Sequence, residues 1–426
     1  MISALILGSF LALMLLRVPV AISITLATMI GMVVGGYDLL SIPQFMAASV
    51  KSTVMLAVPF FILAANLMNA LGVTQRIFDF AAALVGFIRG GLAHVNVVAS
   101  MIFAGISGAA VADAAGLGTI EIRAMRNAGY RLDFAAAVTV ASSTLGPIIP
   151  PSVMMFIYAV TANVSPADMF VAGLLPGVLI GAVLMATVYI RVTTGRQPCP
   201  PPVPFSFRRL VATAGHGILS LVTPLIILWG MVSGTVTPTE AGAVAVFYGL
   251  ILGLAYRTLT WPKLREALYE TVKTSSLILY IIAVSSAMSW VLVAEGTAHD
   301  VAEWLRSVTD NPYVMLVIAN VFLLVLGAIL ETLPAMLIAV PVMLPAVDAV
   351  GIDRVHFGVI VIFNLLIGII TPPMGIGLYI MVAVSRVRLG DLIRASVPYM
   401  LTLVAALLAI TFFPPLTLYL PGLLLR

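Results

Sequence analysis

The chain has 426 residues, of which 62% are hydrophobic and 9% are charged. A typical soluble domain carries about 25% charged residues, and a soluble chain of this length needs a charged exterior around each of its cores. The composition therefore excludes an ordinary soluble protein, a disordered chain and a fibre. It predicts a polytopic membrane protein, and the 21 basic and 17 acidic residues are too dispersed to indicate nucleic-acid binding.

Several kinds of catalytic chemistry find no support in the residues. The single cysteine, Cys199, excludes a disulfide framework and a cysteine-based zinc site. Neither a phosphate-binding GxxxxGK motif followed by Ser or Thr nor an HExxH metalloprotease motif occurs. We therefore expect no enzymatic activity and no cofactor.

Apolar stretches dominate from end to end, and strand-like alternation is nowhere sustained, so we expect an all-α membrane fold rather than a barrel. A spanning helix needs roughly 20 mainly apolar residues. The stretches that predict such spans lie at residues 1–16, 19–36, 54–72, 134–162, 168–190, 217–235, 240–256, 275–294, 356–384 and 397–420.

Two further apolar stretches, 92–122 and 313–349, are interrupted near their middles. The first is broken at Ser107–Gly108 and also holds Asp113, and the second is broken from Glu331 to Pro334. This pattern predicts two re-entrant hairpins of half-length helices. Such a hairpin is tolerated in a bilayer only where its tip is buried in protein or lines a cavity.

Two of the long spans carry breaks at their centres, Thr144–Ser152 with the sequence TLGPIIPPS and Gly368–Gly375 with GIITPPMG. Proline removes a backbone donor and clashes with the preceding helical turn, so adjacent prolines beside glycines predict an unwound segment. A kinked packing helix is the alternative for either motif alone.

The interrupted segments belong to an internal repeat with a constant spacing. Gly129 and Gly351 differ by 222, and residues 45–190 correspond to residues 267–412 on this basis. The other matched pairs are Gly146 with Gly368, Pro150 with Pro372, Pro151 with Pro373, Pro176 with Pro398, and Ala109 with Glu331. A duplication with parallel topology remains an alternative at this point.

The basic residues distinguish parallel from inverted repeats. When the spans are followed along the chain, Lys51, Arg306, Arg354 and Arg426 fall on one side of the membrane and the other 17 of the 21 on the opposite side. The positive-inside rule makes the second side cytoplasmic. We therefore predict inverted repeats with both termini outside the cytoplasm, an architecture typical of secondary transporters.

Five motifs along the chain are informative about the family of the protein. GISGAAVADAAGLGTIEI (105–122), LGPIIPPS (145–152), TPTEAGAVAVFYG (237–249), LETLPAMLIAVPVMLP (330–345) and ITPPMG (370–375) resemble the large membrane subunit, the DctM type, of tripartite ATP-independent periplasmic (TRAP) transporters. The resemblance covers essentially the whole chain.

The resemblance implies sodium-coupled uptake of a small organic acid: a C4-dicarboxylate, a 2-oxo acid, a sugar acid or a sialic acid. It implies two protein partners, a small four-helix membrane subunit (DctQ type) and an extracytoplasmic substrate-binding protein (DctP type), in the bacterial cytoplasmic (inner) membrane. A stand-alone organic-anion carrier, coupled to sodium or protons and needing no binding protein, is the alternative.

The same resemblance implies an elevator mechanism, in which a transport domain moves against a scaffold. The expected division is residues 1–91 (scaffold with an interfacial arm), 92–192 (first hairpin and broken helix), 193–216 (cytoplasmic linker), 217–312 (second scaffold half with an arm) and 313–426 (second hairpin and broken helix).

Carried over by position, the resemblance also implies two sodium sites and a substrate site, with no other metal. The first sodium site would comprise Ser107, Gly108, Thr144, Gly146 and Pro147, and the second Thr332, Leu333, Gly368, Thr371 and Pro372. The substrate carboxylate would lie near Ser107, Ser152 and Thr332.

Two acidic residues are placed inside the membrane away from loop ends, Asp113 and Glu331. Intramembrane ionisable groups are costly and indicate function by default, so both are candidates for ion coupling or gating. The alternative is that each caps a helix start, where a carboxylate is stabilising, and for Asp113 the cap is the favoured interpretation.

Overall fold

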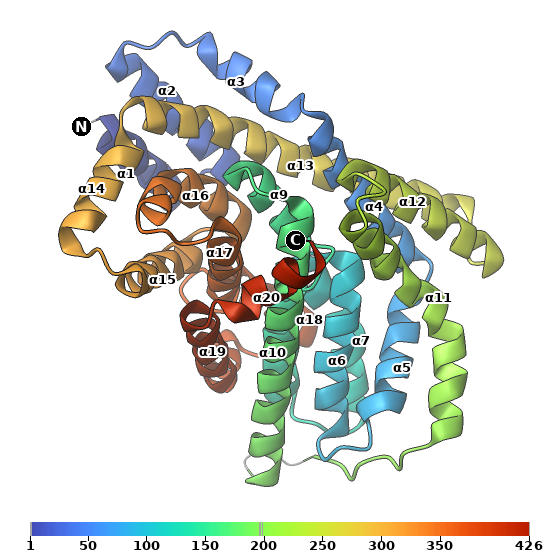
Figure 1. Cartoon of the computed structure of the whole chain (residues 1–426). Helices are drawn as coiled ribbons and strands as arrows, with labels where there is room; N and C mark the ends of the chain where they lie inside the picture. The colour runs from blue at the N-terminus through green and yellow to red at the C-terminus, as the bar shows by residue number, and fades with distance from the viewer. Residues whose placement is uncertain (1, 196, 198, 426) are drawn as a thin grey trace.

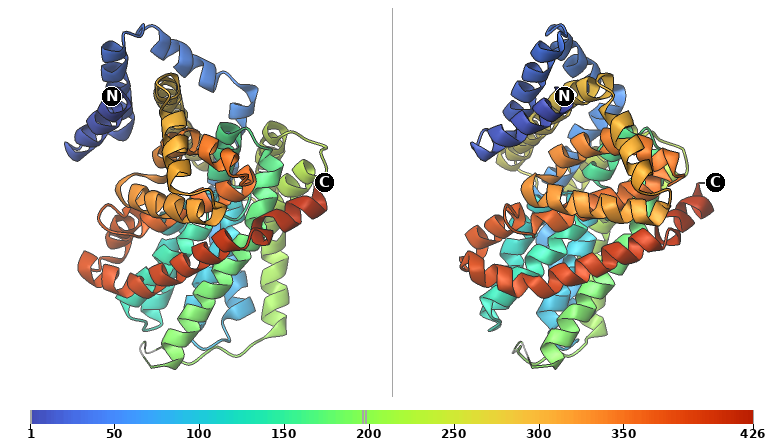
Figure 2. Two further views of the ribbon diagram at one scale, coloured as in Figure 1. Left: turned by 60° about the vertical axis from the view of Figure 1, so that its left-hand side comes forward. Right: turned by 90° about the vertical axis from the view of Figure 1, so that its left-hand side faces the viewer.

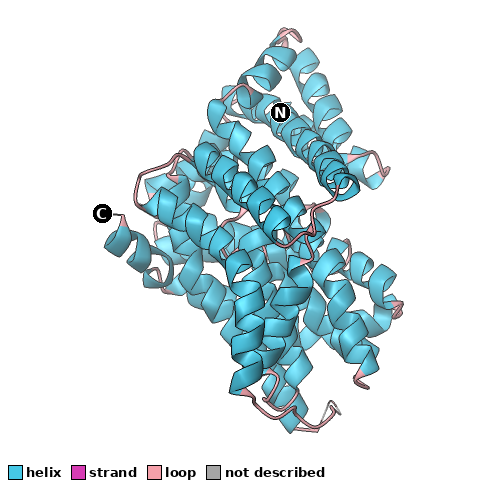
Figure 3. Cartoon of the chain, turned by 90° about the vertical axis from the view of Figure 1, so that its right-hand side faces the viewer, coloured by secondary structure: helices cyan, strands magenta, loops and turns pink. Residues whose placement is uncertain are grey.

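The computed structural model describes residues 2–195, 197 and 199–425, and every regular element in these ranges is helical (Figure 3). Arg196 and Arg426, which entered the charge argument above, lie outside the described residues. Twenty α-helices and two short 3-10 helices occupy the described part of the chain. The predicted all-α membrane fold is therefore confirmed at the level of its elements.

The first half of the chain contains ten α-helices and both 3-10 helices. They are α1 (Ile2–Leu15), α2 (Val20–Gly35), α3 (Ser41–Val50), η1 (Thr53–Leu56), α4 (Ala57–Ala70), α5 (Val73–Val85), α6 (Gly91–Ser107), α7 (Ala110–Asn127), α8 (Leu132–Ser142), η2 (Ser143–Leu145), α9 (Val153–Ala162) and α10 (Pro166–Thr193).

The second half contains the other ten α-helices. They are α11 (Phe207–Val232), α12 (Pro238–Ala255), α13 (Trp261–Ala294), α14 (Thr297–Val308), α15 (Pro312–Ile329), α16 (Thr332–Ala349), α17 (Arg354–Ile369), α18 (Ile376–Ser385), α19 (Leu389–Phe412) and α20 (Pro415–Leu424).

Within the described ranges, seven helical segments have the length and hydropathy to cross a bilayer. These are Thr53–Ala70, Pro166–Thr193, Pro238–Ala255, Trp261–Ala294, Pro312–Ile329, Thr332–Ala349 and Leu389–Phe412. Several other apolar helices are shorter, among them α6, α8, α9, α17 and α18. Short apolar helices of this kind are the parts expected of broken spans. The second predicted hairpin differs, because its helices α15 and α16 each have 18 residues and are among the seven. They are therefore longer than the half-length helices that the sequence predicts.

The repeat seen in the sequence reappears in the helix ends. Helix α7 begins at Ala110 and α16 begins at Thr332, which is 222 residues later, and their last residues, Asn127 and Ala349, differ by the same number. Helices α8 and α17 begin at Leu132 and Arg354, again 222 residues apart. The two halves therefore build the same series of elements.

One difference between the halves lies where α3, η1 and α4 of the first half correspond to the single long helix α13. Ser52 takes an extended conformation, and its side chain accepts a hydrogen bond from the Val54 amide, which starts a new helical segment. Helix α13 instead continues for 34 residues. Its first turns carry Lys263, Arg265 and Glu266, which is why hydropathy alone predicts a start at 275.

A frame of helices runs along the top and the right-hand side of the molecule in Figure 1, with the hairpins on its inner side. Helix α13 crosses the molecule beside α3 and α4, while α10 packs on α6 of the first hairpin and on α17 and α19 (Figure 1). The frame comprises α1–α4 and α11–α13, which pack on one another. The amphipathic helices α5 and α14, predicted as interfacial arms, connect this frame to α6 and α15, as two further views show (Figure 2).

The two halves are joined by hydrogen bonds between α9 and the start of α17 and between α10 and α19. The Tyr158 hydroxyl of α9 donates to the Arg354 carbonyl at 2.7 Å, and Arg354 Nη1 donates back to the Ala162 carbonyl at 2.9 Å. The hydroxyls of Thr187 in α10 and Thr402 in α19 lie 2.8 Å apart.

The non-helical part of the predicted cytoplasmic linker, 193–216, is shorter than expected. Helix α10 runs through Thr193, and α11 begins at Phe207. Ser206 starts α11 by accepting a hydrogen bond from the Arg209 amide at 3.4 Å. Only the proline-rich part of the segment stays outside a helix, since proline lacks the amide that a helix interior needs.

A close backbone contact between two helices generates a prediction about stability. A Cβ atom on Gly368 of α17 would lie 2.3 Å from the carbonyl carbon and oxygen of Gly327 in α15. Because the opposing atoms are backbone, rotamer changes cannot relieve the clash, and we expect Gly368→Ala to destabilise the fold by about 1–3 kcal/mol. Thermal unfolding of the purified protein measures this loss.

Gly390→Ala is the matched control, because a Cβ atom there meets nothing within 4 Å and the residue also lies inside a helix, α19. Its unfolding temperature should stay at or above that of the wild type. Equal unfolding temperatures for the two variants would contradict the close α15–α17 packing.

Candidate functional site

The tip of the first hairpin is a two-residue turn between α6 and α7. Ser107 ends α6, Gly108 has a φ of +59°, and Ala109 is extended. The positive φ explains the glycine, because side chains disfavour this region. A Cβ atom on Gly108 would also lie 3.1 Å from the Pro151 carbonyl oxygen. The tip therefore rests directly on the first helix break.

The first break runs from Gly146 to Ser152, between η2 and α9. Pro150 supplies no amide to the Gly146 carbonyl four residues earlier, and a Cβ atom on Gly146 would lie 3.3 Å from the Ala109 carbonyl carbon of the hairpin tip. Tip and break thus interlock through Gly108 and Gly146. The structure brings all five residues of the predicted first sodium site, Ser107, Gly108, Thr144, Gly146 and Pro147, into this one region.

Ser152 has a structural role in this break, as the cap of the next helix. Its hydroxyl donates to the Pro147 carbonyl at 2.6 Å and accepts from the Met155 amide at 3.2 Å, which makes it the N-cap of α9. The side chain is fully buried. Its donor is therefore used inside the protein, and only a remaining lone pair is free for a ligand.

The tip of the second hairpin consists of Leu330 and Glu331, both in extended conformations, before α16 starts at Thr332. Thr332 and Leu333 are buried at the first turn of α16. The Thr332 hydroxyl has no hydrogen-bond partner among the described residues, and the same holds for the Ser107 hydroxyl at the first tip. These two hydroxyls are the unsatisfied polar groups of the two tips.

The second break lies between Ile369 and Ile376, and it contacts the second hairpin. The Met374 amide donates to the Ala328 carbonyl at 3.2 Å, just before the hairpin tip. The Thr371 hydroxyl donates to the Ile367 carbonyl at 2.8 Å. The Pro150–Pro151 and Pro372–Pro373 peptide bonds of the two breaks are both cis. The predicted second site, Thr332 and Leu333 with Gly368, Thr371 and Pro372, is thus assembled from one tip and one break.

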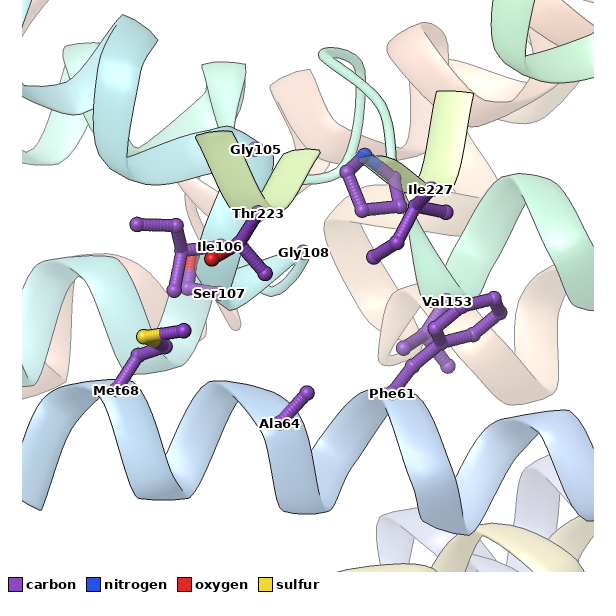
Figure 4. Close-up of a pocket in the computed structure, with 11 residues that line it drawn as sticks. Phe61, Ala64, Met68, Gly105, Ile106, Ser107, Gly108, Val153, Thr223 and Ile227 are labelled. Atoms are coloured by element: carbon purple, nitrogen blue, oxygen red, sulfur yellow. The ribbon is translucent and has the colours of Figure 1, made fainter. Parts of the chain in front are cut away.

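A narrow crevice of about 10 Å³, roughly the size of one water molecule, separates the first tip from the frame (Figure 4). The tip contributes Ser107 and Gly108, and Thr223 of α11 lies across from them. The remaining lining residues are Phe61, Ala64 and Met68 of α4, Gly105, Ile106, Pro151, Val153 and Ile227. The predicted ion and substrate residues of the first tip therefore face the boundary between hairpin and frame.

The tips and breaks bring two kinds of polarity together. Four helices begin at the tips and breaks: α7 at Ala110, α9 at Val153, α16 at Thr332 and α18 at Ile376. Helix N-termini carry partial positive charge and attract anions. Hydroxyl and carbonyl oxygens suit a hard cation. Such a site can hold a carboxylate and a cation close together.

The two acids predicted inside the membrane take different positions. Asp113 is 1% exposed in the first turn of α7, whereas Glu331 is exposed at the N-cap position of α16. Glu331, the N-cap residue of α16, makes no side-chain capping hydrogen bond. Asp113 lies in the first turn of α7, where a carboxylate is stabilised by the helix N-terminus, although neither of its oxygens has a hydrogen-bond partner among the described residues.

A third intramembrane acid, Glu121, escaped the sequence analysis. The hairpin was expected to end at 122, which placed Glu121 beside a loop, but α7 continues to Asn127 and Glu121 is 1% exposed. Its spacing from Asp113, eight residues, puts both acids on one face of a helix. That spacing was the signal in the sequence that indicated a shared environment.

A family model described as "Tripartite ATP-independent periplasmic transporter, DctM component" matches residues 7–416. The sialic acid TRAP transporter large permease protein SiaM of Vibrio cholerae is 41% identical over 90% of this chain and 89% of its own length. The C4-dicarboxylate TRAP transporter large permease protein DctM of Pseudomonas aeruginosa is 36% identical over 86% of both chains.

Two other similarities extend the comparison. The sialic acid TRAP transporter permease protein SiaT of Haemophilus influenzae is 36% identical over 98% of this chain, which spans 68% of SiaT. Among solved structures, the YdaH transporter of Alcanivorax borkumensis superposes with a TM-score of 0.58 at 17% identity, covering 88% of each chain. This last similarity concerns the fold alone.

Proposed function

This chain belongs to the DctM component family of tripartite ATP-independent periplasmic transporters, and we propose that it carries out sodium-coupled uptake of a small organic acid. It is a multi-pass membrane protein and a transporter component rather than an enzyme. The single observation that carries the proposal is the pair of tip-and-break units, each offering hydroxyl and carbonyl oxygens beside helix N-termini.

The coupling ion is sodium, bound at the two tip-and-break units. Sodium is a hard cation that takes oxygen ligands, and the unwound breaks and the unpartnered hydroxyls of Ser107 and Thr332 supply them. Thr371 donates its hydrogen to a backbone carbonyl, so its oxygen lone pairs remain available to a cation. This supports one site per unit, with the residues predicted above.

The substrate is a small organic acid whose carboxylate lies between the two tips, near Ser107, Ser152 and Thr332. The four helix N-termini that begin at the tips and breaks favour an anion there. The names of SiaM and DctM attribute sialic acid and C4-dicarboxylates to those relatives. Both classes carry a carboxylate, and we propose an acid of this range for the present chain.

The repeats have inverted topology, and transport proceeds by an elevator motion. Arg131 and Arg354 start equivalent helices, α8 and α17, and the charge distribution puts them on opposite sides of the membrane. The hairpins, the broken helices α8–α9 and α17–α18, and the helices α10 and α19 form the moving domain. The frame helices form the scaffold, with α5 and α14 as connecting arms, and both termini face the periplasm across the bacterial inner membrane.

Two protein partners complete the transporter, as the word tripartite in the family description implies. A small membrane subunit braces the scaffold, and an extracytoplasmic binding protein delivers the substrate. SiaT, of which this chain spans 68%, is long enough to contain a second component. The stand-alone carrier is disfavoured because the matched family is a multi-component one.

Reconstitution tests the proposal. Proteoliposomes that contain this chain and its small subunit should accumulate a labelled organic acid only when the binding protein and an inward sodium gradient are both present. Replacing sodium with choline should abolish uptake. Uptake that persists without the binding protein would favour the stand-alone carrier, and uptake that persists without sodium would overturn the coupling ion.

The ion sites predict a change in sodium dependence. Ser107→Ala and Thr371→Ala each remove one oxygen ligand of a proposed site, so we expect the sodium concentration for half-maximal uptake to rise about 3- to 30-fold, which corresponds to roughly 0.6–2 kcal/mol. The measurement is initial uptake rate against sodium concentration in the complete system.

Thr25→Ala is the matched control for Thr371→Ala. The Thr25 hydroxyl donates to the Ala21 carbonyl four residues earlier, just as Thr371 does to Ile367, but it lies in frame helix α2. Its sodium dependence should stay at the wild-type value. If all three variants behave like the wild type, the proposed ligands are wrong.

The proposed topology predicts the accessibility of the segment between α10 and α11. A single cysteine placed at residues 200–206, in a Cys199→Ser background, should react with a membrane-impermeant thiol reagent only when the cytoplasmic face is opened. A cysteine at residue 310, between α14 and α15, should react from the outside. The reverse pattern would contradict inverted repeats with external termini.

A further inference from the structure

Two carboxylic acids are buried on the same helix of the first hairpin, about two turns apart. Asp113 and Glu121 on α7 are each 1% exposed, and they lie about 12 Å apart along the helix axis, since each residue rises 1.5 Å. Both oxygens of Asp113 and Oε1 of Glu121 lack a hydrogen-bond partner of good geometry among the described residues. Burying unpaired carboxylates is costly.

Four buried polar side chains connect the two acids. Ser100 of α6 lies beside Asp113 and donates to Ser142 of α8 at 3.1 Å. Ser142 donates to Asn96 Oδ1 of α6 at 2.7 Å. Asn96 Nδ2 donates to Thr139 of α8 at 2.6 Å, and Thr139 lies beside Glu121. We call this series, Ser100–Ser142–Asn96–Thr139, the relay.

The relay has a direction, because each hydroxyl has one hydrogen to donate. The Ser100 hydrogen is used on Ser142, so Asp113 can bond to Ser100 only as a donor, which requires a protonated carboxyl group. At the other end Thr139 accepts from Asn96 and has its own hydrogen free for Glu121. In this arrangement the proton is on Asp113, and Glu121 is the acceptor.

The side-chain amide of Asn96 can also be flipped, since its oxygen and nitrogen exchange places with little change in shape. Every donor in the relay then reverses, Ser100 donates to Asp113, and Glu121 must supply a proton to Thr139. Ser142 has a second acceptor, the Thr139 carbonyl at 3.0 Å, but using it would leave Asn96 Oδ1 unpaired. In both complete arrangements, one carboxyl group of the pair is protonated.

No cation is seen to pair with either acid in the described part of the chain. Helix α7 itself carries two basic residues, Arg123 and Arg126, and both are exposed. The helices that pack against α7 are α5, α6, α8 and α18, together with η2. The titratable side chains on those helices are five: Arg76, Asp79, His94, Asp133 and Tyr379.

Of these five side chains, three have contacts elsewhere, and the other two provide no cation that pairs with Asp113 or Glu121. Arg76 lies over the Tyr256 ring, Asp79 accepts from Gln75, and Asp133 is paired with Arg131. Tyr379 is exposed and His94 is buried without a partner among the described residues. The pair therefore has no resident counter-ion in the described part of the chain.

The hairpin fold does not itself require the two acids. At an offset of 222 residues, the second hairpin unit has Ala335 and Met343 in place of Asp113 and Glu121, and Ile318, Phe322 and Val361 in place of Asn96, Ser100 and Thr139. Ser142 corresponds to Asn364, a buried residue that bonds to Asn320, so the second unit keeps a polar contact there but no acid at the matched positions. Gly118 lets α8 approach the acids, because a Cβ atom there would lie 2.8 Å from Thr139 Cγ2. The two buried acids are thus a feature of the first hairpin that its repeat lacks.

We propose that Asp113 and Glu121 form a proton-binding site in the first hairpin, which retains one proton at one end of the relay or at the other. The two positions differ by the orientation of the Asn96 amide and of the hydroxyls. Because α7 runs from the hairpin tip to its base, the proton resides either near the tip, on Asp113, or near the base, on Glu121.

Infrared difference spectroscopy of the purified full-length protein at neutral pH tests the site without any transport assay. An amide at either end can donate to the relay in place of a protonated acid, so Asp113→Asn and Glu121→Gln should each remove the retained proton. The difference spectrum of wild type minus each variant should contain the carbonyl band of a protonated carboxyl group, shifted in heavy water.

Asp133→Asn is the control, because that acid is held as a carboxylate by Arg131 at 2.6 Å, and its difference spectrum should lack the band. Ser142→Ala keeps both acids but breaks the relay, so the band should persist at a shifted frequency, which makes this variant a second test if an amide variant does not fold.

Two results in these spectra would contradict the proposal. Absence of the band from both the Asp113→Asn and the Glu121→Gln difference spectra would show that both groups are ionised. Disappearance of the wild-type band on replacing choline chloride with sodium chloride would identify a sodium site instead. Both outcomes are independent of whether the chain transports an organic acid.

Discussion

An unwound backbone cannot face lipid, and the rest of this structure depends on that constraint. Each unwound segment exposes amides and carbonyls that no water can reach in the bilayer core. The protein meets this constraint by placing each hairpin tip beside a helix break. In the first half the break from Gly146 to Ser152 is largely buried, and Gly108 of the tip lies against Pro151. In the second half the Met374 amide of the break bonds to Ala328 just before the tip, but residues 372–374 are exposed on this chain. Glycine is needed at position 108 because a side chain would separate tip and break.

The same solution concentrates polarity at the tips and breaks. The helices that begin there bring their N-termini, and the breaks bring oxygens that no amide satisfies. A cation and a carboxylate need these complementary groups, so the proposed ion and substrate sites follow from the way in which the backbone problem is solved. The frame lies alongside these units, and the narrow crevice at Ser107 marks where one tip meets it.

The two halves share their elements but differ in their interiors. At the matched positions the second hairpin unit has apolar residues in place of Asp113 and Glu121, and among the four relay residues only Ser142 has a polar counterpart, Asn364. Duplication supplies a common scaffold, and substitutions inside one copy give that copy a titratable interior. An asymmetry of this kind is expected when a repeated fold acquires a property that only one of its copies provides.

The sequence by itself determined the membrane class, the positions of the hairpin tips at Ser107–Gly108 and at Glu331, the two Pro-Pro breaks and the 222-residue repeat. These features are local, since hydropathy, proline and glycine act on their own segment of the chain. It missed Glu121, the early start of α13 at Trp261 and the start of α11 at Phe207, because charged residues end a hydropathy window without ending a helix. Only the tertiary structure decided that each tip lies on its break, that Ser152 is used as a cap while Ser107 and Thr332 stay unpaired, and that two acids on α7 are joined through α6 and α8. Those relations depend on side chains that meet from distant parts of the chain, and no local pattern encodes such contacts.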